Sequence, residues 1–121
     1  MKRLAVLLLV AITACNAKQE TPEPMKPLGD PARGKVLIVD HGCNVCHIIP
    51  GIAGPQGSMG PSLEGVGSRP TISYGKVPNT PANLARYVAT PQALNPQSTM
   101  PELGLQGNDG GDIAAYLLTL R

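Results

Sequence analysis

The feature that most constrains this 121-residue chain is the segment Cys43-Asn44-Val45-Cys46-His47. Two thiols and one imidazole within five residues can form a disulfide, bind zinc, carry out thiol redox exchange or hold a haem. Each of these uses requires different surroundings elsewhere in the chain. The remaining residues therefore decide between them.

The C-x-x-C-H spacing is typical of covalent haem c attachment. Two thiols three residues apart can each add to one of the two vinyl groups of a haem. The next residue then lies under the ring centre, where an imidazole nitrogen can reach the iron. The sequence predicts one covalent haem c, with Cys43 and Cys46 as the thioether residues and His47 as an axial ligand of the iron.

The other three uses of the cluster find less support. A structural zinc site usually needs four ligands, and only His41 offers a further imidazole. Thioredoxin-like exchange needs a βαβ setting, which this sequence does not predict. A disulfide suits an exported protein, but it explains neither His47 nor the weak core of the chain.

The chain lacks the aromatic side chains that usually fill a small core. It has no Trp, no Phe and three Tyr, and it contains 14 Gly and 13 Pro. Since aromatic rings supply much of the buried area in a small core, a loop-rich domain of this size is marginal by itself. A large apolar cofactor would fill the centre.

Hydrophobic periodicity and helix-start signals predict an all-α fold with three main helices and long loops. Asp30 and Thr80 are N-cap residues, and each is followed by Pro at the first helical position. Residues 48–79 contain no predicted helix or strand, which is reasonable if this loop wraps a cofactor. The three predicted helices run from Pro31 to about Gly42, from Pro81 to about Thr90 before a second loop, and from Asn108 or Asp109 to the C-terminus.

The N-terminus has the pattern of a bacterial export signal. Lys2 and Arg3 precede an apolar run that is too short to span a bilayer. The residues Ile12-Thr13-Ala14-Cys15 are similar to a lipobox, which predicts a signal peptide over residues 1–14 and lipidation of Cys15. Cleavage after Ala17, which would release a soluble periplasmic protein, is the alternative.

The composition changes after the leader. Residues 15–30 are polar and rich in proline, so they predict a flexible tether, and residues 31–121 are the predicted haem domain. Eight Lys and Arg then balance eight Asp and Glu, because Lys2 and Arg3 belong to the leader. A neutral domain has no basic face of the kind that nucleic acid requires, so no nucleic-acid partner is expected.

The second axial ligand of the iron must come from a distant part of the chain to reach the opposite face. Met59 lies only 12 residues after His47, in the glycine-rich loop on the proximal side. Met100 lies much further along, and Pro101 stiffens its segment and keeps it out of a helix. The sequence therefore predicts Met100 as the distal ligand.

These motifs resemble the class I cytochromes c over residues 31–121, in particular the cytochrome c domains of subunit II in some bacterial haem–copper oxidases and related free-standing monohaem cytochromes. Arg69 and Gly75 also match the family pattern. The matching segments are CNVCHIIPG, GPSL, PNTPANL, TPQALNP, MPELG and DIAAYLLTL, in that order.

The resemblance implies roles for residues around the haem. The carbonyl of Pro61 would accept a hydrogen bond from the far nitrogen of His47. Leu63 would pack on the haem, and Arg69 and Asn79 would lie near its propionates. Tyr87 stands where such domains often have Trp, so it would contact a propionate with a different reach. Gly34 in the first helix would allow a close approach of Tyr116 in the last helix.

Together these features predict an electron carrier rather than an enzyme: a monomeric, membrane-anchored monohaem cytochrome c on the periplasmic side of a bacterial membrane. His/Met ligation leaves the iron no open position, so transfer would be outer-sphere and involve single electrons. The expected partners are redox proteins, such as a membrane oxidase or an upstream quinol-oxidising or dehydrogenase complex. Two alternatives stay open: a haem enzyme or gas sensor with a displaceable distal ligand, and a module that uses the dithiol without haem.

Overall fold

The computed structural model describes residues 28–121. The predicted signal peptide, Cys15 and residues 15–27 of the predicted tether lie outside the described residues. The elements, in chain order, are α1 (Pro31–Asp40), α2 (Cys43–Cys46), the 3-10 helix η1 (Val66–Ser68), β1 (Thr71–Ile72), β2 (Val77–Pro78), α3 (Pro81–Ala89), α4 (Pro91–Leu94) and α5 (Asp109–Leu117).

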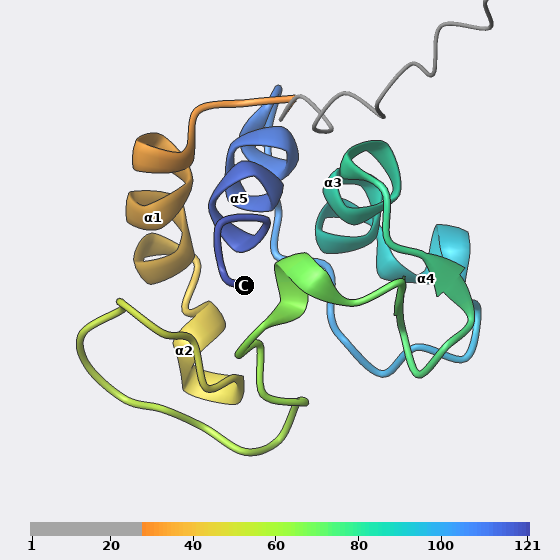
Figure 1. The fold of residues 1–121 in the computed structure, drawn as a ribbon, viewed down its shortest axis with the longest axis horizontal. Coiled ribbons are helices and arrows are strands. Elements are labelled where there is room, and N and C mark those ends of the chain that lie inside the picture. Colours follow the sequence, from red (N-terminus) through yellow and green to blue (C-terminus); the bar gives the residue numbers. More distant parts are fainter. Residues whose placement is uncertain (1–27) are drawn as a thin grey trace, which may run out of the picture.

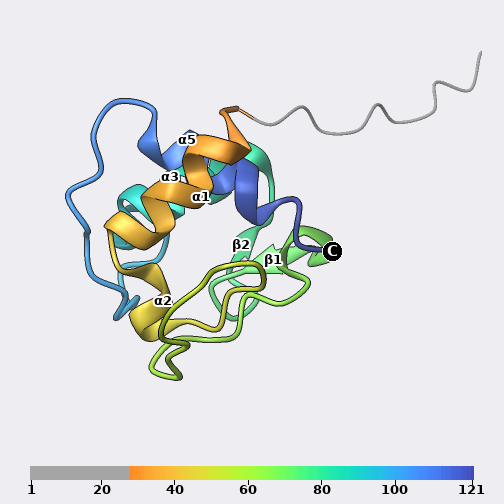
Figure 2. The ribbon, with the colours of Figure 1, turned by 90° about the vertical axis from the view of Figure 1, so that its left-hand side faces the viewer.

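Three main helices form one layer of the molecule, and loops form the other. Helix α5 packs against both α1 and α3, and it lies between them in Figure 1. Helix α2 and the chain that follows it lie below this layer in both views (Figures 1 and 2). The predicted all-α class with three main helices is confirmed. No helix within residues 28–121 has the length and apolar character needed to cross a membrane.

The helices begin where their capping residues predict. The Asp30 carboxylate accepts a hydrogen bond from the Ala32 N–H at 2.8 Å, and Thr80 Oγ1 accepts one from the Asn83 N–H at 3.1 Å. Helix α1 ends slightly before the predicted Gly42, with His41 as its C-cap. Each cap satisfies a backbone donor that the first helical turn leaves free.

Five short elements were not predicted from the sequence: α2, η1, β1, β2 and α4. The 3-10 helix η1 lies inside residues 48–79, so the prediction that this stretch contains no helix is wrong at Val66–Ser68. Pro91 ends α3, as expected, but it also occupies the first position of α4, where the sequence predicts a loop. Strands β1 and β2 pair antiparallel, with Thr71 opposite Pro78, inside the stretch predicted to have no strand. Elements of four residues or fewer are too short to show a hydrophobic period.

Gly34 permits the close packing of α1 on α5, but its neighbour differs from the predicted one. A Cβ atom built on Gly34 would lie 2.5 Å from the Asp112 carbonyl carbon and 3.0 Å from the Ile113 nitrogen. The hydroxyl of Tyr116 instead donates to the carbonyl of Pro50 at 2.7 Å. The predicted contact between Gly34 and Tyr116 is therefore wrong by about one helical turn, and Gly34 faces the backbone of α5.

The core is built from aliphatic side chains. Ile38 of α1, Leu84 and Val88 of α3, and Ile113 and Leu117 of α5 are all buried. They form one apolar cluster in which the described residues supply no fully buried aromatic ring. The aliphatic core matches the aromatic-poor composition. The three helices are therefore joined by small and medium-sized apolar side chains.

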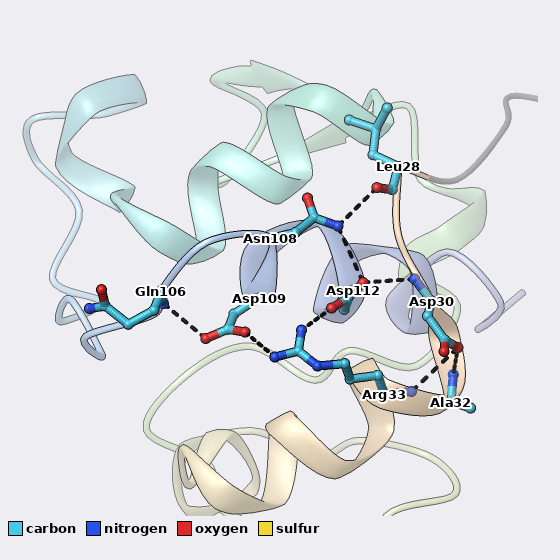
Figure 3. Close-up of polar contacts among 8 residues, drawn as sticks. All are labelled: Leu28, Asp30, Ala32, Arg33, Gln106, Asn108, Asp109 and Asp112. Atoms are coloured by element: carbon cyan, nitrogen blue, oxygen red, sulfur yellow. Dashed lines mark hydrogen bonds and ion pairs between the residues drawn. The ribbon is translucent and has the colours of Figure 1, made fainter.

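An ion-pair cluster joins the start of α1 to the start of α5 (Figure 3). The Arg33 guanidinium pairs with Asp109 Oδ1 at 2.7 Å and with the carboxylate of Asp112. The second oxygen of Asp112 accepts hydrogen bonds from the Asp30 N–H at 2.8 Å and from the Asn108 amide at 3.3 Å. The side chains of Asp109 and Asp112 are only 10% and 6% exposed, whereas that of Arg33 is 52% exposed, so the two carboxylates are shielded from water and their cationic partner is not.

The same contacts shift the titration of both carboxylates. The Gln106 N–H and then Arg33 lower the pKa of Asp109. The Asp30 N–H and then Arg33 lower the pKa of Asp112. Since both pKa values are lower in the folded state, these groups stabilise the fold at pH values above the unfolded pKa of about 3.9. That contribution is lost as the pH falls through the folded pKa values.

We therefore expect Asp112→Asn to lower the melting temperature of the haem-loaded protein by roughly 4–8 °C at pH 7. The difference from the wild type should persist down to about pH 5 and shrink as the pH falls below the unfolded pKa of about 3.9, because the unfolded wild type then takes up a proton that the folded state, with its lower pKa, does not yet bind. Far-UV circular dichroism at a series of pH values measures it. Asp40→Asn, at an exposed position of α1, is the control and should change little. A difference that does not depend on pH would contradict this account.

Candidate functional site

Cys43 and Cys46 lie at the two ends of α2, one helical turn apart. Both are free thiols and partly buried. Burial raises the pKa of the Cys43 thiol, which is opposite to the lowered pKa of reactive redox dithiols. Cys43 therefore lacks the activation that a redox thiolate needs.

His47 ends α2 in an extended conformation, and a carbonyl holds its ring. The His47 Nδ1 atom lies 2.7 Å from the carbonyl oxygen of Pro61. A carbonyl only accepts, so Nδ1 carries the proton and Nε2 is left with its lone pair available to a metal. The contact implied by the family resemblance is present in the structure.

Gly60 also supports the imidazole, and sequence reasoning missed it. The Gly60 N–H donates to the Cys46 carbonyl at 2.8 Å. A Cβ atom on Gly60 would lie 2.7 Å from His47 Nδ1 and 2.9 Å from Nε2, so the ring packs directly against a backbone without a side chain. The sequence could have indicated this role, because Gly60 directly precedes Pro61 and is the first residue of the GPSL motif.

We expect Gly60→Ala to displace the His47 ring from Pro61, because the added methyl group has no space. Overpacking of this kind costs about 1–3 kcal/mol. The haem-loaded variant should show altered visible bands and a changed reduction potential. Gly65→Ala is the control: its φ of +64° is unfavourable for alanine, but no atom lies within 4 Å of the added Cβ. It should lower stability without changing the spectrum, and equal spectral changes in the two variants would contradict the role of Gly60.

Met100 lies in the irregular segment between α4 and α5, and its residue is partly buried. In Figure 1, α2 and the segment after α4 lie on opposite sides of the lower half of the molecule. Met59, the competing methionine, is 87% exposed. The structure thus distinguishes one partly covered methionine from one that faces solvent.

Tyr87 is tied to the segment that carries Met100. Its hydroxyl lies 2.8 Å from Ser98 Oγ, and the same Ser98 Oγ accepts a hydrogen bond from the Met100 N–H at 3.3 Å. The family resemblance implied a contact between Tyr87 and a propionate, and the contact with Ser98 was not predicted. The propionate contact stays a prediction.

Arg69 and Asn79, both predicted near the propionates, organise the loop before α3. The Arg69 guanidinium donates to the carbonyls of Ser62 and Glu64, both at 2.8 Å. The Asn79 amide donates to the carbonyls of Val66 at 2.8 Å and Arg69 at 2.9 Å. Asn79 has therefore used both its hydrogens, and its place beside a propionate stays a prediction.

Asn79 Oδ1 is buried and has no hydrogen-bond partner within residues 28–121. A buried acceptor without a donor is unfavourable, so this atom is a place where a bound group or water would be accommodated.

Leu63, the predicted haem-packing residue, is partly buried against the apolar cluster, and its N–H donates to the Ile48 carbonyl at 2.8 Å.

These residues fit a covalently attached haem. Two free thiols lie beside one imidazole whose Nε2 is available, and Gly60 leaves room for that ring. Val45 and Ile48, which border the cysteines in sequence, expose 57% and 39% of their surface, so apolar surface is available there. In the described part of the chain, no three His, Cys, Asp or Glu side chains gather in a way that could hold a bare metal ion.

Comparisons with known proteins agree with this geometry. The family model described as "Cytochrome c" matches residues 31–121. Cytochrome c2 from Paracoccus denitrificans superposes with a TM-score of 0.58 at 24% identity, over 75% of this chain and 95% of that one. Ferric cytochrome c-550 from Paracoccus versutus superposes with a TM-score of 0.58 at 22% identity, over 76% and 98%. A comparison with curated protein sequences gave no significant match.

Proposed function

Because the chain belongs to the cytochrome c family, we propose that it is a membrane-anchored monohaem cytochrome c that carries single electrons between respiratory redox partners. Members of this family bind one haem c covalently and are electron carriers rather than enzymes. The observation that carries the proposal is the His47 ring, held by Pro61 directly after two free thiols.

Each residue of the site has a defined task in this function. When bound, the haem supplies a one-electron iron couple. Cys43 and Cys46 would hold it through thioethers. Pro61 holds Nδ1 of His47 and so would leave the more basic Nε2 for the iron. Met100 would supply a second, soft thioether ligand, which would favour reduced iron and raise the reduction potential. With both ligands supplied by the protein, substrate would have no coordination position.

Electrons would enter and leave without bond formation, at the edge of the site beside the cysteines. Val45, between them, is 57% exposed, so a partner can approach this edge closely. Such contacts are small and short-lived. The equal numbers of acidic and basic residues after the leader provide no strong overall charge to steer a partner.

The test of this function is a spectrum of the reduced protein under carbon monoxide. We expect sharp haem c bands on reduction, a one-electron redox titration and no change when carbon monoxide is added, because Met100 occupies the distal position. Rapid carbon monoxide binding or peroxidase turnover would instead favour a haem enzyme or gas sensor. Absence of haem bands would favour a dithiol module without haem.

The proposal places the domain on the periplasmic side of a bacterial membrane, held by a lipid on Cys15. The lipobox-like sequence Ile12-Thr13-Ala14-Cys15 supports this. A tether over residues 15–30 would keep the domain close to membrane enzymes and raise its effective concentration there. The partners would be a membrane oxidase and an upstream quinol-oxidising or dehydrogenase complex.

Cys15→Ser tests the anchor. We expect the wild-type protein in the membrane fraction, released by detergent but not by salt, and the variant in the soluble periplasmic fraction. Fractionation followed by haem staining measures the distribution. The visible spectrum should be the same for both proteins, because Cys15 lies outside the haem domain. A wild-type protein that is already soluble would support cleavage after Ala17 instead.

A further inference from the structure

One side chain holds the backbone on both sides of Thr99. The Nε2 group of Gln92 donates to the carbonyl of Met100 at 2.7 Å and to the carbonyl of Ser98 at 3.0 Å. Both hydrogens of the Gln92 amide are therefore directed at the segment that presents Met100. Neither contact follows from the CNVCH motif or from the choice of Met100 as ligand.

The segment has few other connections. Besides those of Gln92, the described hydrogen bonds from residues 98–103 to other parts of the chain are the Tyr87–Ser98 contact, the bond from the Ser98 N–H to the Asn95 carbonyl at 2.9 Å and the 3.1 Å contact between His41 Nδ1 and the Leu103 carbonyl. Pro101 has no N–H to donate. Gln92 therefore makes the only described hydrogen bond from another element to Met100 itself.

Gln92 is itself mounted on a rigid element. It is the second residue of α4, whose first residue, Pro91, is fully buried. At the other end of this turn, the Asn95 amide donates to Ser73 Oγ at 2.8 Å, and Asn95 is 8% exposed. Because both ends of α4 are anchored, the Gln92 side chain that it carries can hold the loop in one position.

We propose that Gln92 is the positioning residue for the Met100 ligand. By holding the carbonyls of Ser98 and Met100, it keeps the thioether at the iron and opposes the displacement of Met100 by other ligands. This inference rests on the proposed function, in which Met100 ligates the haem iron. Moving Met100 away requires both Gln92 hydrogen bonds to break, so losing them makes the open state easier to reach.

The test is imidazole binding to the ferric, haem-loaded protein, since imidazole competes with Met100 for the iron. Two hydrogen bonds are lost, each with a net contribution of about 0.5–1.5 kcal/mol, so we expect Gln92→Leu to bind imidazole roughly five- to 150-fold more tightly than the wild type. The weak long-wavelength ferric band and the reduction potential should also fall. A purely structural role for Gln92 would change the melting temperature without changing these three quantities.

Gln97→Leu is the matched control. Gln97 is exposed in the same segment, and its described hydrogen bond comes from its backbone N–H, to Asn95 Oδ1 at 3.1 Å. Its imidazole affinity should equal that of the wild type. A second pair, Gln92→Glu and Gln97→Glu, adds the same charge to both positions, but only the first places acceptors against the two carbonyls. The two glutamate variants provide the test if Gln92→Leu does not fold.

Equal imidazole affinities in the Gln92 variants and the wild type would overturn the proposal. A Met100→Ala variant separates this failure from a failure of the proposed function. If Met100→Ala also leaves the spectrum and the imidazole affinity unchanged, Met100 is not the ligand, and both proposals are wrong. If only the Gln92 variants are silent, the ligand assignment stands and the positioning role is wrong.

Discussion

The double variant Cys43→Ala, Cys46→Ala is expected to lose covalent haem completely. These residues are the free thiols of α2, and without them no thioether can form. The core of the described domain is aliphatic, with no fully buried aromatic ring, so little else compensates for a missing cofactor. Haem staining after denaturing electrophoresis should fall to background, and far-UV circular dichroism should show loss of helix.

Cys15→Ser is the matched control for this experiment, because it removes the third cysteine of the chain. It should keep full haem staining. Single variants should retain at most one thioether, which gives visible bands shifted toward those of a vinyl-bearing haem. Haem that stays bound to the double variant through denaturation would show that attachment does not use Cys43 and Cys46.

Met100→Ala is expected to remove the weak long-wavelength ferric band and to lower the reduction potential. The thioether favours reduced iron, and axial ligands span about 0.8 V of haem potentials. We expect a decrease of at least about 0.1 V, roughly one eighth of that span. Absorption spectroscopy and a potentiometric titration measure the two effects.

Met59→Ala is the control for the methionine experiment. Met59 is 87% exposed, so its removal should leave the band and the potential as in the wild type. The reverse result, with the band lost in Met59→Ala and retained in Met100→Ala, would overturn the ligand assignment. It would also remove the basis for the positioning role of Gln92.

Local sequence signals predicted the parts of the fold that depend on neighbouring residues. The caps at Asp30 and Thr80 act within three residues, so both helix starts were predictable. Helix α4 was not, because Pro91 both ends one helix and begins another. The partner of Gly34 depends on how α1 crosses α5, and no local pattern specifies that geometry.

In the candidate site too, features set by neighbouring residues could be predicted, and features set by tertiary packing could not. Cys43, Cys46 and His47 are contiguous, so their chemistry could be predicted from spacing alone. Pro61 came from the family resemblance, and its contact with His47 is seen in the structure. The contacts of Gln92 with the Met100 segment depend on how a short helix turns back on a loop, which residue types do not encode.

The cluster around Asp112 has a mechanical consequence for a tethered domain. Asp112 holds the Asp30 N–H at 2.8 Å, and the Asn108 amide holds the Leu28 carbonyl at 3.1 Å. A pull that arrives from the N-terminal side therefore loads the first turn of α5 before it reaches α1. Helix α2 lies at the opposite end of α1 from this point (Figures 1 and 2). If the domain is tethered to a membrane as proposed, the first turn of α5 would take up the strain, and His47, which directly follows α2, would lie at the far end of α1 from it.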